Sequence, residues 1–288
     1  MPVFADDQYE LLDFGNGIKL ENFNGVTVER PCPAAKSARR STAASETSRT
    51  LVRFDRQSEI WSGESVPDAW TIKFGSSFAL ELKPSPFGHL GVFPEQAANW
   101  QWLMETANSI NPDNEELNAI NLFAYTGGST LALSSAGVRV THVDAASNIC
   151  RRAKRNAALS GLDNRPIRWI AEDVMTFLKR EVKRGRRYDI VVADPPSFGR
   201  GPKKQQWKLN RDLPELLELA VELTEGSPAA ILISCHTGGF EAPVLQKMVS
   251  QTFGLPRRQI KAAPMVLRTS SGRTLNAGHC VRWSKDTS

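Results

Sequence analysis

The sequence predicts an α/β protein built on a doubly wound, mostly parallel sheet of seven strands, with a small, mainly β region in front of it. From residue 86 onward, short apolar runs alternate with amphipathic stretches of helical length, which is typical of a parallel sheet covered by helices on both faces. Before residue 86, apolar and polar residues alternate singly around Gly-Asn-Gly and Asn-Gly, which indicate hairpins. At 288 residues and 41% hydrophobic, the chain can bury a large core without a metal or a disulfide.

The first 85 residues are expected to form an accessory region of short strands. YELLDFGNGIKLENFNGVTVERP and WTIKFGSSFALELKP both show the alternation of a half-buried strand. Residues 33–50 lie between them, are rich in Ala, Ser, Thr and Arg, and contain few apolar side chains, so they predict a flexible basic linker or arm. We therefore place a domain boundary between residues 85 and 86, with the main domain spanning residues 86–288.

The main domain is expected to add one strand and one helix after another. Its strands are predicted at residues 119–123, 139–143, 167–170, 190–193 and 230–234, with weaker candidates at 259–266 and 278–283. Its helices are predicted at residues 95–106, 129–136, 148–160, 174–183, 209–223 and 242–252.

The bulk properties of the chain exclude several classes of protein. No apolar run approaches the roughly 20 residues that a membrane span requires, and the N-terminal MPVFADDQYE has neither the basic nor the apolar stretch of a secretion signal. The four cysteines, Cys32, Cys150, Cys235 and Cys280, lie far apart and predict neither a zinc site nor a disulfide framework. A cytoplasmic protein without a bound metal or a membrane partner is therefore expected.

The ends of the predicted strands carry the functional prediction, because ligands of an open parallel sheet bind beyond the carboxyl ends of its strands. The first strand runs into NLFAYTGGST, where Gly127 and Gly128 allow a tight turn close to a ligand and Ser129 begins a helix with free N–H groups. An ordinary helix start entered through a flexible turn accounts for the same residues.

Two carboxylates follow at the next strand ends. Asp144 ends the second strand, roughly 20 residues after the glycine loop begins, where a carboxylate can bind the two hydroxyls of a ribose. Asp173 ends the third strand, where it could accept a hydrogen bond from an adenine amino group. Either acid would also serve as the N-cap of the helix that follows it. Together the glycine loop and Asp144 favour an adenosine-type cofactor.

The fourth strand ends in an acid, two prolines and an aromatic. In YDIVVADPPSFGRG, the apolar run at residues 190–193 meets DPPSF, which begins at Asp194. Proline cannot donate to a sheet ladder, so the pairing stops and the chain turns out of the sheet. A dehydrogenase could share the glycine loop and Asp144, but it has no need of this turn. The fifth strand ends in SCH, which places Cys235 at its tip.

These strand ends resemble those of a known family. NLFAYTGG, Asp144, Asp173 and DPPSF resemble the motifs of class I S-adenosylmethionine-dependent methyltransferases and occur in the expected order. More narrowly, GVFPEQ at residues 91–96, the NLFAYTGG loop, DPPSF and the strand ending in SCH are similar to the bacterial 23S rRNA cytosine-5 methyltransferase family, over about residues 70–285. The resemblance implies a Rossmann-like methyltransferase sheet, S-adenosylmethionine as cofactor and ribosomal RNA as substrate.

The resemblance also implies which residues contact the cofactor. They lie in the segment before the first helix of the main domain, in the loop after its first strand, and at the ends of the next three strands. They are Phe93, Gln96, Asn121, Phe123, Ala124, Tyr125, Thr126, Gly127, Ser129, Asp144, Ala145, Asp173, Val174 and Asp194.

The turn at Asp194 is expected to meet the base that receives the methyl group. A planar base needs a stacking face and an acceptor for its exocyclic amine, which Phe198, Asp194 and the carbonyl of Pro195 can offer. Carbon 5 of cytosine is a poor nucleophile, and attack of a thiolate on carbon 6 activates it. Cys235 matches the nucleophile position of the family, and His236 could lower its pKa, although a free cysteine on a strand is commonly just buried.

Other functions remain open at this point. An exocyclic nitrogen of guanine or adenine could accept the methyl group instead, because Asp-Pro-Pro with an aromatic suffices for that reaction and no cysteine is needed. The chain could also be a nicotinamide-dependent oxidoreductase, or a nucleic-acid-binding protein that keeps a cofactor fold without catalysis.

The positive charge is unevenly distributed along the chain, which has a formal net charge of +5. It gathers in RRAKR at 151–155, KREVKRGRR at 179–187 and RGPKK at 200–204. Such clusters attract a polyanion without sequence preference, although the first two can equally be solvated helix faces. The third cluster directly follows the DPPSF turn, so its members are predicted RNA contacts: Arg200, Lys203 and Lys204.

The basic residues 39–53 are a second candidate for contact with RNA, although disorder without a function accounts for them more simply. The sequence leaves open whether the protein is a monomer or a homodimer.

Overall fold

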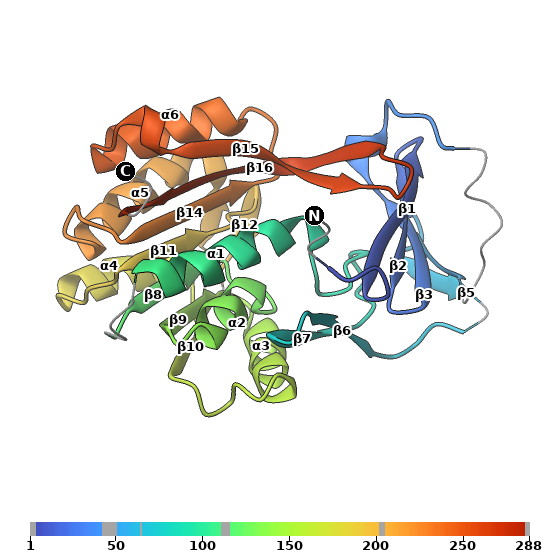
Figure 1. The fold of residues 1–288 in the computed structure, drawn as a ribbon, viewed down its shortest axis with the longest axis horizontal. Helices are drawn as coiled ribbons and strands as arrows, with labels where there is room; N and C mark the ends of the chain where they lie inside the picture. Colours follow the sequence, from blue (N-terminus) through green and yellow to red (C-terminus); the bar gives the residue numbers. More distant parts are fainter. Residues whose placement is uncertain (1–3, 42–50, 64, 111–115, 202–204, 286–288) are drawn as a thin grey trace. The chain divides into compact units, whose positions relative to one another are not determined.

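The computed structural model describes residues 4–41, 51–63, 65–110, 116–201 and 205–285 (Figure 1). The chain forms two compact units, the first made of residues 1–97 with 266–277 and the second of residues 98–265 with 278–288. Compactness alone does not test whether a segment folds independently, so the domain boundary predicted after residue 85 stays a prediction.

The first unit is mainly β, as its alternating sequence predicts. A five-stranded sheet has the order β1-β2-β3-β4-β5, and a separate hairpin joins β6 and β7. Asn16 with Gly17 and Asn24 with Gly25 have positive φ in the two turns that Gly-Asn-Gly and Asn-Gly predict. The strands are β1 (Tyr9–Gly15), β2 (Ile18–Phe23), β3 (Val26–Pro31), β4 (Leu51–Asp55), β5 (Ile60–Gly63), β6 (Trp70–Phe74) and β7 (Phe78–Leu82).

Residues 33–41 of the first unit pack on its sheet. The short helix η1 (Pro33–Ala35) buries Ala35, the guanidinium of Arg40 lies 2.9 Å from the carboxylate of Glu29, and the Ser41 N–H donates to Asp13 at 3.1 Å. These contacts place residues 33–41 against the sheet, and the flexible basic linker expected at residues 33–50 stays a prediction. Residues 42–50, which include most of the basic arm predicted at 39–53, lie outside the described residues.

A distant part of the chain completes the first unit. Residues 266–277 belong to this unit; they comprise the end of β15 (Lys261–Arg268), the turn that follows it and the start of β16 (Thr274–Ser284). There the Arg273 guanidinium pairs with the buried Asp13 carboxylate and lies 4.3 Å from the centre of the Phe14 ring. The sequence does not predict this pairing, because it joins residues that lie far apart in the chain.

The second unit contains the predicted seven-stranded sheet. Its order is β10-β9-β8-β11-β14-β16-β15; β10, β9, β8, β11 and β14 are parallel, and β16 is antiparallel to β14. The chain adds strands on one side of β8 and then, from β11, on the other, so the strand order reverses between β8 and β11. The strands not yet given are β8 (Asn118–Leu122), β9 (Arg139–Asp144), β10 (Ile167–Ala171), β11 (Ile190–Ala193) and β14 (Ala230–Cys235).

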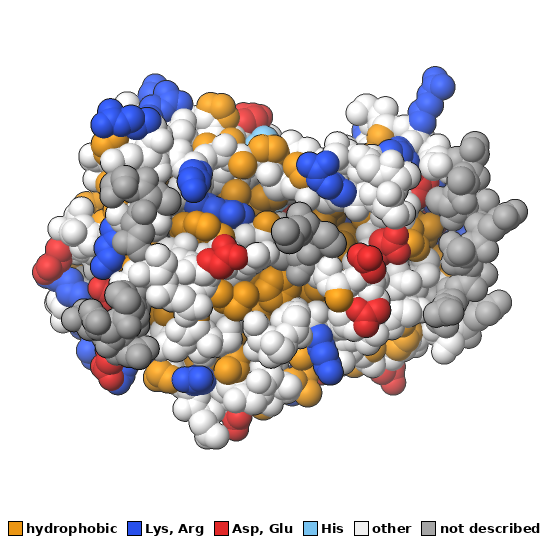
Figure 2. All heavy atoms as spheres, in the orientation of Figure 1, with side chains coloured by type: hydrophobic (Ala, Val, Ile, Leu, Met, Phe, Trp, Pro, Cys, Tyr) orange, Lys and Arg blue, Asp and Glu red, His pale blue; other side chains and the backbone are white. Residues whose placement is uncertain are grey.

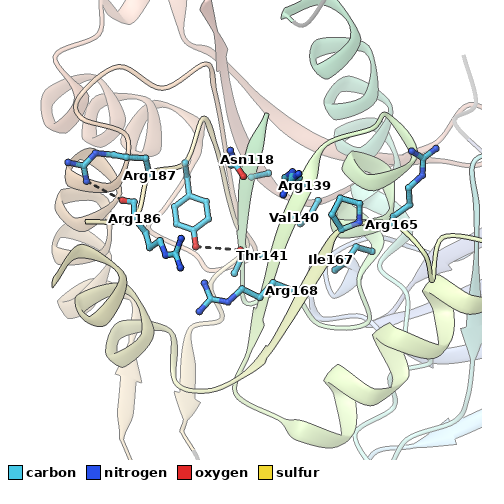
Figure 3. Close-up of a pocket in the computed structure, with 12 residues that line it drawn as sticks. Asn118, Arg139, Val140, Thr141, Arg165, Ile167, Arg168, Arg186 and Arg187 are labelled. Carbon is cyan, nitrogen blue, oxygen red and sulfur yellow. Dashed lines mark hydrogen bonds between the residues drawn. The ribbon is translucent and has the colours of Figure 1, made fainter. Parts of the chain in front are cut away.

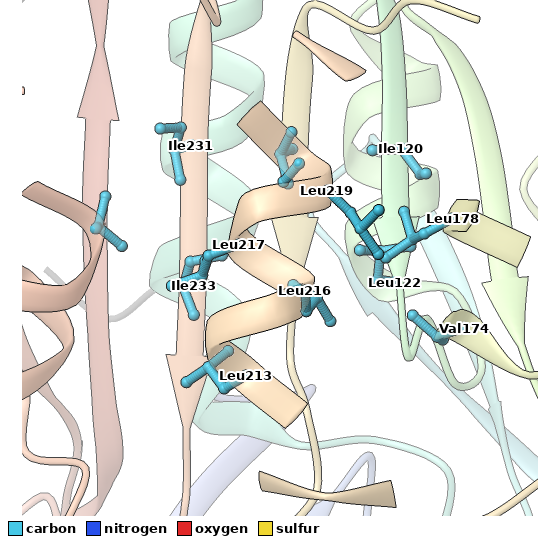
Figure 4. Packing of buried hydrophobic residues seen from close by; sticks show 14 of the residues in the cluster. Ile120, Leu122, Val174, Leu178, Leu213, Leu216, Leu217, Leu219, Ile231 and Ile233 are labelled. Carbon is cyan, nitrogen blue, oxygen red and sulfur yellow. The ribbon is translucent and has the colours of Figure 1, made fainter. Parts of the chain in front are cut away.

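Helices cover both faces of this sheet, which is why its strands read as continuous apolar runs. On β8, Ala119 faces a core cluster formed with α1 and α2, while Ile120 and Leu122 face a second cluster formed with α4, α5 and α6. Figure 4 shows leucines of α5 lying between β14, β8 and α4 in that second cluster. The helices are α1 (Ala97–Ile110), α2 (Gly128–Ser135), α3 (Ser147–Leu159), α4 (Val174–Lys183), α5 (Leu209–Leu223) and α6 (Ala242–Phe253), with short helices η3 (Pro94–Gln96) and η4 (Arg257–Gln259).

Two further findings concern the elements of the chain. A hairpin of β12 (Phe198–Arg200) and β13 (Gln206–Lys208) stands between β11 and α5, where the sequence predicts only a turn. Among the described residues, no helix has the length and the apolar character needed to cross a membrane.

Candidate active site

The loop that follows β8 has a strained backbone. Phe123, Tyr125 and Gly127 have φ values of 55°, 50° and 96°, and the first two are side-chain-bearing residues in a region that such residues rarely adopt. Surrounding structure holds the loop in place, since the Asn156 side chain donates to the Thr126 carbonyl at 2.9 Å. Non-glycine strain of this kind clusters at ligand sites, so the loop is a candidate for function on its geometry alone.

The two glycines of the loop are needed for packing. A Cβ on Gly127 would lie 3.3 Å from the Cβ of Ala153 in α3, and a Cβ on Gly128 would lie 2.4 Å from the Trp100 ring in α1. The absent side chains therefore let α3 and α1 approach the loop. From the sequence, we explain these glycines by a turn that comes close to a ligand; in the structure, the space beside them is taken up by the two helices.

Asp144 lies beside this loop at the end of β9. One carboxylate oxygen accepts the Tyr125 N–H and the other accepts the Ala146 N–H, both at 2.9 Å. Burial raises the pKa of the Asp144 carboxyl, and these two hydrogen bonds oppose that effect. Each oxygen keeps a further lone pair, so the group can still accept hydrogen bonds from two neighbouring hydroxyls.

Asp173 caps α4. Its Oδ1 accepts hydrogen bonds from the backbone N–H of Thr176 at 2.9 Å and from the Thr176 hydroxyl at 2.8 Å. The N-cap interpretation of this residue is thus confirmed. A contact of Asp173 or of the next residue, Val174, with the adenine ring stays a prediction.

A buried polar network lies beneath the loop. Asn121 donates to the Thr130 hydroxyl at 2.9 Å, and the same hydroxyl lies 2.9 Å from Nδ1 of His142. All three side chains are buried, and burial lowers the pKa of His142 to about 3. The amide of Asn121 is bound within this network, and its contact with the cofactor stays a prediction. Sequence reasoning missed Thr130 and His142; the only signal was a histidine inside the apolar run VRVTHV.

The tips of β11 and β14 are joined by side chains. Asp194 accepts a hydrogen bond from the Ser234 hydroxyl at 2.7 Å, and Nε2 of His236 lies 3.5 Å from the same carboxylate oxygen. The hydroxyls of Ser197 and Thr237 are 2.6 Å apart. The acid-diproline turn is therefore fixed against the neighbouring strand, with Asp194 still about 30% exposed.

A tryptophan that the sequence analysis missed supports the same turn. Nε1 of Trp207, on β13, donates to the Pro196 carbonyl at 2.7 Å, and its ring centre lies 4.7 Å from that of Phe123. Trp207 thus links the loop after β8 with the turn after β11. Of the predicted base contacts in this turn, Phe198 is 75% exposed and available for stacking, whereas Pro195 is buried.

Cys235 ends β14, next to the end of β11 where Asp194 lies, but its side chain faces away from Asp194. Successive strand residues point to opposite faces, and Cys235 joins the core cluster with α5 and α6, whereas Ser234 points to Asp194. The thiol is fully buried, its sulfur accepts the Thr237 N–H at 3.4 Å, and burial raises its pKa. Nε2 of His236, the possible activator of Cys235, lies 3.5 Å from the Asp194 carboxylate, and its role in lowering the pKa of Cys235 stays a prediction.

The remaining predicted site residues fall into three groups. Ala124 is buried in the loop after β8, while Ser129 and Ala145 are partly exposed at the starts of α2 and of the segment after β9. Arg200 is exposed at the end of β12, and Lys203 and Lys204 lie outside the described residues. Phe93 and Gln96 belong to the first unit, so their contact with a cofactor stays a prediction. Within the described ranges, no cluster of side chains could hold a metal ion.

Comparison with known proteins agrees with this geometry. Residues 28–238 match the S-adenosylmethionine-dependent methyltransferase family. The chain belongs to this family. A crystal structure of an S-adenosylmethionine-dependent methyltransferase from Agrobacterium tumefaciens is 30% identical, with a TM-score of 0.86 over 98% of this chain and 91% of that one. SMU.776, solved with S-adenosylhomocysteine, is 17% identical with a TM-score of 0.74 over 98% and 76%, and it shows the fold alone.

Curated relatives of this methyltransferase match over a shorter segment. Ribosomal RNA large subunit methyltransferase I of Aeromonas hydrophila is 31% identical over 137 residues, which is 47% of this chain and 34% of the relative. Ribosomal RNA large subunit methyltransferase K of Neisseria meningitidis is 32% identical over 138 residues, 47% and 38% of the two chains. The match thus spans little more than a third of these relatives.

Family membership identifies the chain as a methyltransferase with S-adenosylmethionine as its cofactor, and decides against the oxidoreductase alternative. The residues of the methyltransferase fit that cofactor. Asp144 presents a carboxylate with free lone pairs beside a strained loop at the strand reversal, which is where a doubly wound sheet binds a nucleoside.

Proposed function

We propose that this methyltransferase modifies a base of ribosomal RNA, with carbon 5 of cytosine as the acceptor and Cys235 as the nucleophile. The observation that carries the proposal is the acid-diproline turn, which lies at the strand reversal beside the tip of β14 and is tied to it through Asp194 and Ser234. The names of the two curated relatives support RNA as the substrate class.

In this proposal, the residues of the chain orient both reactants. When bound, the cofactor supplies an electrophilic methyl group. Asp144 binds the ribose of the cofactor, and the loop at 123–127 shapes the pocket around it. Phe198 stacks on the target base, because its ring is exposed beside the turn. Asp194 accepts a hydrogen bond from the exocyclic amine of the base and fixes the direction in which carbon 5 points.

Cys235 then supplies the activation that carbon 5 requires. Its thiolate forms a bond to carbon 6, and carbon 5 takes the methyl group. A base or water then removes the carbon 5 proton, and the thiolate leaves carbon 6 as the ring double bond re-forms. The Thr237 N–H that points at the sulfur stabilises the thiolate. Because the thiol lies in the core, residues 235–237 must shift before the sulfur can reach the base.

The burial of Cys235 favours a second candidate acceptor, an exocyclic nitrogen of guanine or adenine. That reaction needs no thiolate, and the turn supplies a partly exposed acid beside an exposed aromatic. The raised pKa of Cys235 is then simply that of a buried thiol.

Product analysis distinguishes the two acceptors. The enzyme is incubated with labelled S-adenosylmethionine and ribosomal RNA, and the RNA is digested to nucleosides. We expect labelled 5-methylcytidine. The rate at which it forms should fall at least about a thousandfold in Cys235→Ala, because the attacking group is gone. The rate should also rise about tenfold per pH unit below the raised thiol pKa, since only the thiolate attacks.

Cys280→Ala is the matched control. Cys280 lies on β16 opposite Ser234, is equally buried and also has a pKa raised by burial. It should keep most of the activity. Labelled methylguanosine or methyladenosine, formed equally well by Cys235→Ala, would establish the nitrogen acceptor instead.

A further inference from the structure

A cavity of about 480 Å³ lies at the opposite edge of the second unit's sheet from the candidate active site (Figure 3). It is lined by the first residues of β8, β9 and β10 and by the segment that leads into β11, which are the amino ends of parallel strands. Asp144 is the last residue of β9 and Asp194 directly follows β11, so both lie at the carboxyl ends of the strands. The cavity therefore has no part in binding the cofactor.

Five arginines from separate segments line this cavity. Figure 3 shows Arg186 and Arg187 at one end and Arg165 at the other, with Arg139 and Arg168 between them. All five side chains are exposed, so their guanidinium groups can turn toward a ligand. The other seven lining residues include no carboxylate.

Neighbouring acids neutralise this charge only in part. Arg139 pairs with Glu116 and Arg187 with Glu225, but both glutamates are well exposed, so water and salt weaken these pairs. Only Arg168 has a buried acid, the carboxylate of Glu181 at 2.7 Å, which Arg184 and the Tyr188 hydroxyl share.

Arg165 and Arg186 are the two arginines of the cavity to which the preceding ion pairs do not extend. Within the described residues, no ion pair joins either guanidinium to a carboxylate. Five cations around one cavity repel one another, which costs free energy unless an anion is bound. Solvated surface arginines would more ordinarily project from one helix face; these come from three separate segments of the chain and converge on a shared opening.

The ligand chemistry that fits is phosphate. A guanidinium presents a planar fork of N–H groups that matches two phosphate oxygens, and arginine keeps its charge at every physiological pH. The Tyr188 hydroxyl donates to Glu181 at 2.8 Å and has a pKa raised to about 12 by burial, so it adds no negative charge. The arginines extend from one end of the cavity to the other, which suits a series of phosphates better than a single one.

We propose that this arginine cavity binds successive phosphates of RNA and anchors the substrate at the sheet edge remote from methyl transfer. The choice of RNA as the ligand rests on the proposed function, whereas the cavity and its five arginines are observed independently of it. The face of the molecule in Figure 2 shows basic and acidic side chains interspersed, so a cavity lined by five arginines and no acid differs from the surface drawn there.

The test is RNA binding by the double variant Arg165→Ala with Arg186→Ala. Fluorescence anisotropy of a labelled large-subunit ribosomal RNA transcript should show affinity about tenfold weaker at low salt. The slope of log affinity against log salt should fall by about 1.4, at about 0.7 for each single-stranded phosphate that the variant no longer binds. The corresponding double Lys variant, which keeps both charges, should recover most of the affinity.

Two controls separate this effect from misfolding and from general charge loss. Affinity for S-adenosylhomocysteine, measured by calorimetry, should stay unchanged in the double variant. Arg257→Ala with Arg258→Ala removes the same charge from exposed positions before β15, at the far end of the sheet, and should leave RNA binding close to wild type.

Each other outcome overturns the proposal in a distinguishable way. Equal losses in the two double variants would mean that charge alone matters, not the cavity. The Arg165–Arg186 variant could instead keep wild-type RNA affinity while losing the binding of pyrophosphate that calorimetry detects for the wild-type protein. That result would identify a site for a free anion. A wild-type protein that binds no RNA would overturn the proposed function as well. If the wild type and the Arg165–Arg186 variant bind RNA with equal affinity and both methylate it, the cavity proposal alone is overturned.

Discussion

At the scale of single residues, the sequence predicts those side chains whose role follows from their position at a strand end. Asp144 and Asp194 could be found in this way, because an acid at the tip of a parallel strand must lie at the ligand edge. His142 and Trp207 could not. Each acts through a partner that is brought to it by folding, a hydroxyl on α2 for His142 and the Pro196 carbonyl for Trp207.

The buried His142 predicts a loss of stability in acid. Its pKa is lowered to about 3 in the folded protein, against about 6.5 when unfolded, so between these values only the unfolded chain takes up the proton. Stability is unaffected above pH 6.5 and falls by up to about 1.4 kcal/mol per pH unit below it. Urea unfolding at pH 7 and pH 5 should show this decrease.

His142→Gln is the matched variant, because a Gln side chain can still bond the Thr130 hydroxyl but does not titrate. It should be less stable at pH 7 and should lose less on going to pH 5. An identical pH dependence in both proteins would mean that other groups cause the acid sensitivity.

At the scale of elements, the amphipathic helices were predicted best. The bounds predicted for α4 and α5 agree with the structure, because each has a continuous apolar stripe facing the sheet and a clear end. The β12–β13 hairpin was not predicted. Its strands have three residues each, and a basic, glycine-containing run separates them, so no periodicity marks them in the sequence. Long-range pairing, rather than local propensity, specifies such short strands.

The hairpin makes Trp207 a positioning residue, and its replacement tests this role. Trp207→Phe keeps a ring against Phe123 but loses the hydrogen bond to the Pro196 carbonyl, which costs about 1 kcal/mol of stability. Because the turn proposed to receive the base loosens, we expect kcat for RNA methylation to fall about tenfold while affinity for S-adenosylhomocysteine stays the same.

Steady-state kinetics and calorimetry measure the two quantities. A merely structural tryptophan would predict parallel losses of cofactor affinity and stability with kcat unchanged per folded molecule. That result would contradict the role of Trp207 as a positioning residue.

At the scale of the whole molecule, composition and alternation were enough to predict an α/β sheet of seven strands with a mainly β region before it. They could not predict which segments make up each compact unit. The turn at residues 266–277 belongs to the first unit because Arg273 pairs with Asp13, and no local pattern signals a contact between residues so far apart.

This connection predicts that residues 1–97 do not fold stably as a fragment. Without Arg273 the buried Asp13 keeps the Ser41 N–H and, as its one charged partner among the described residues of the fragment, the more distant guanidinium of Arg40 at 3.6 Å. Breaking a buried ion pair costs about 3–5 kcal/mol. Circular dichroism with urea unfolding should show no cooperative transition for the fragment. Arg273→Ala in the full chain should fold but unfold at lower urea. A fragment that unfolds as cooperatively as the full chain would contradict the prediction.

The turn at 266–277 also limits how such proteins can be recombined. An N-terminal piece moved from one relative to another would arrive without the late stretch that completes it, and the recipient's own stretch would meet a foreign surface. Productive chimaeras should therefore exchange both segments together, and natural variation at Asp13 should be matched by variation at Arg273.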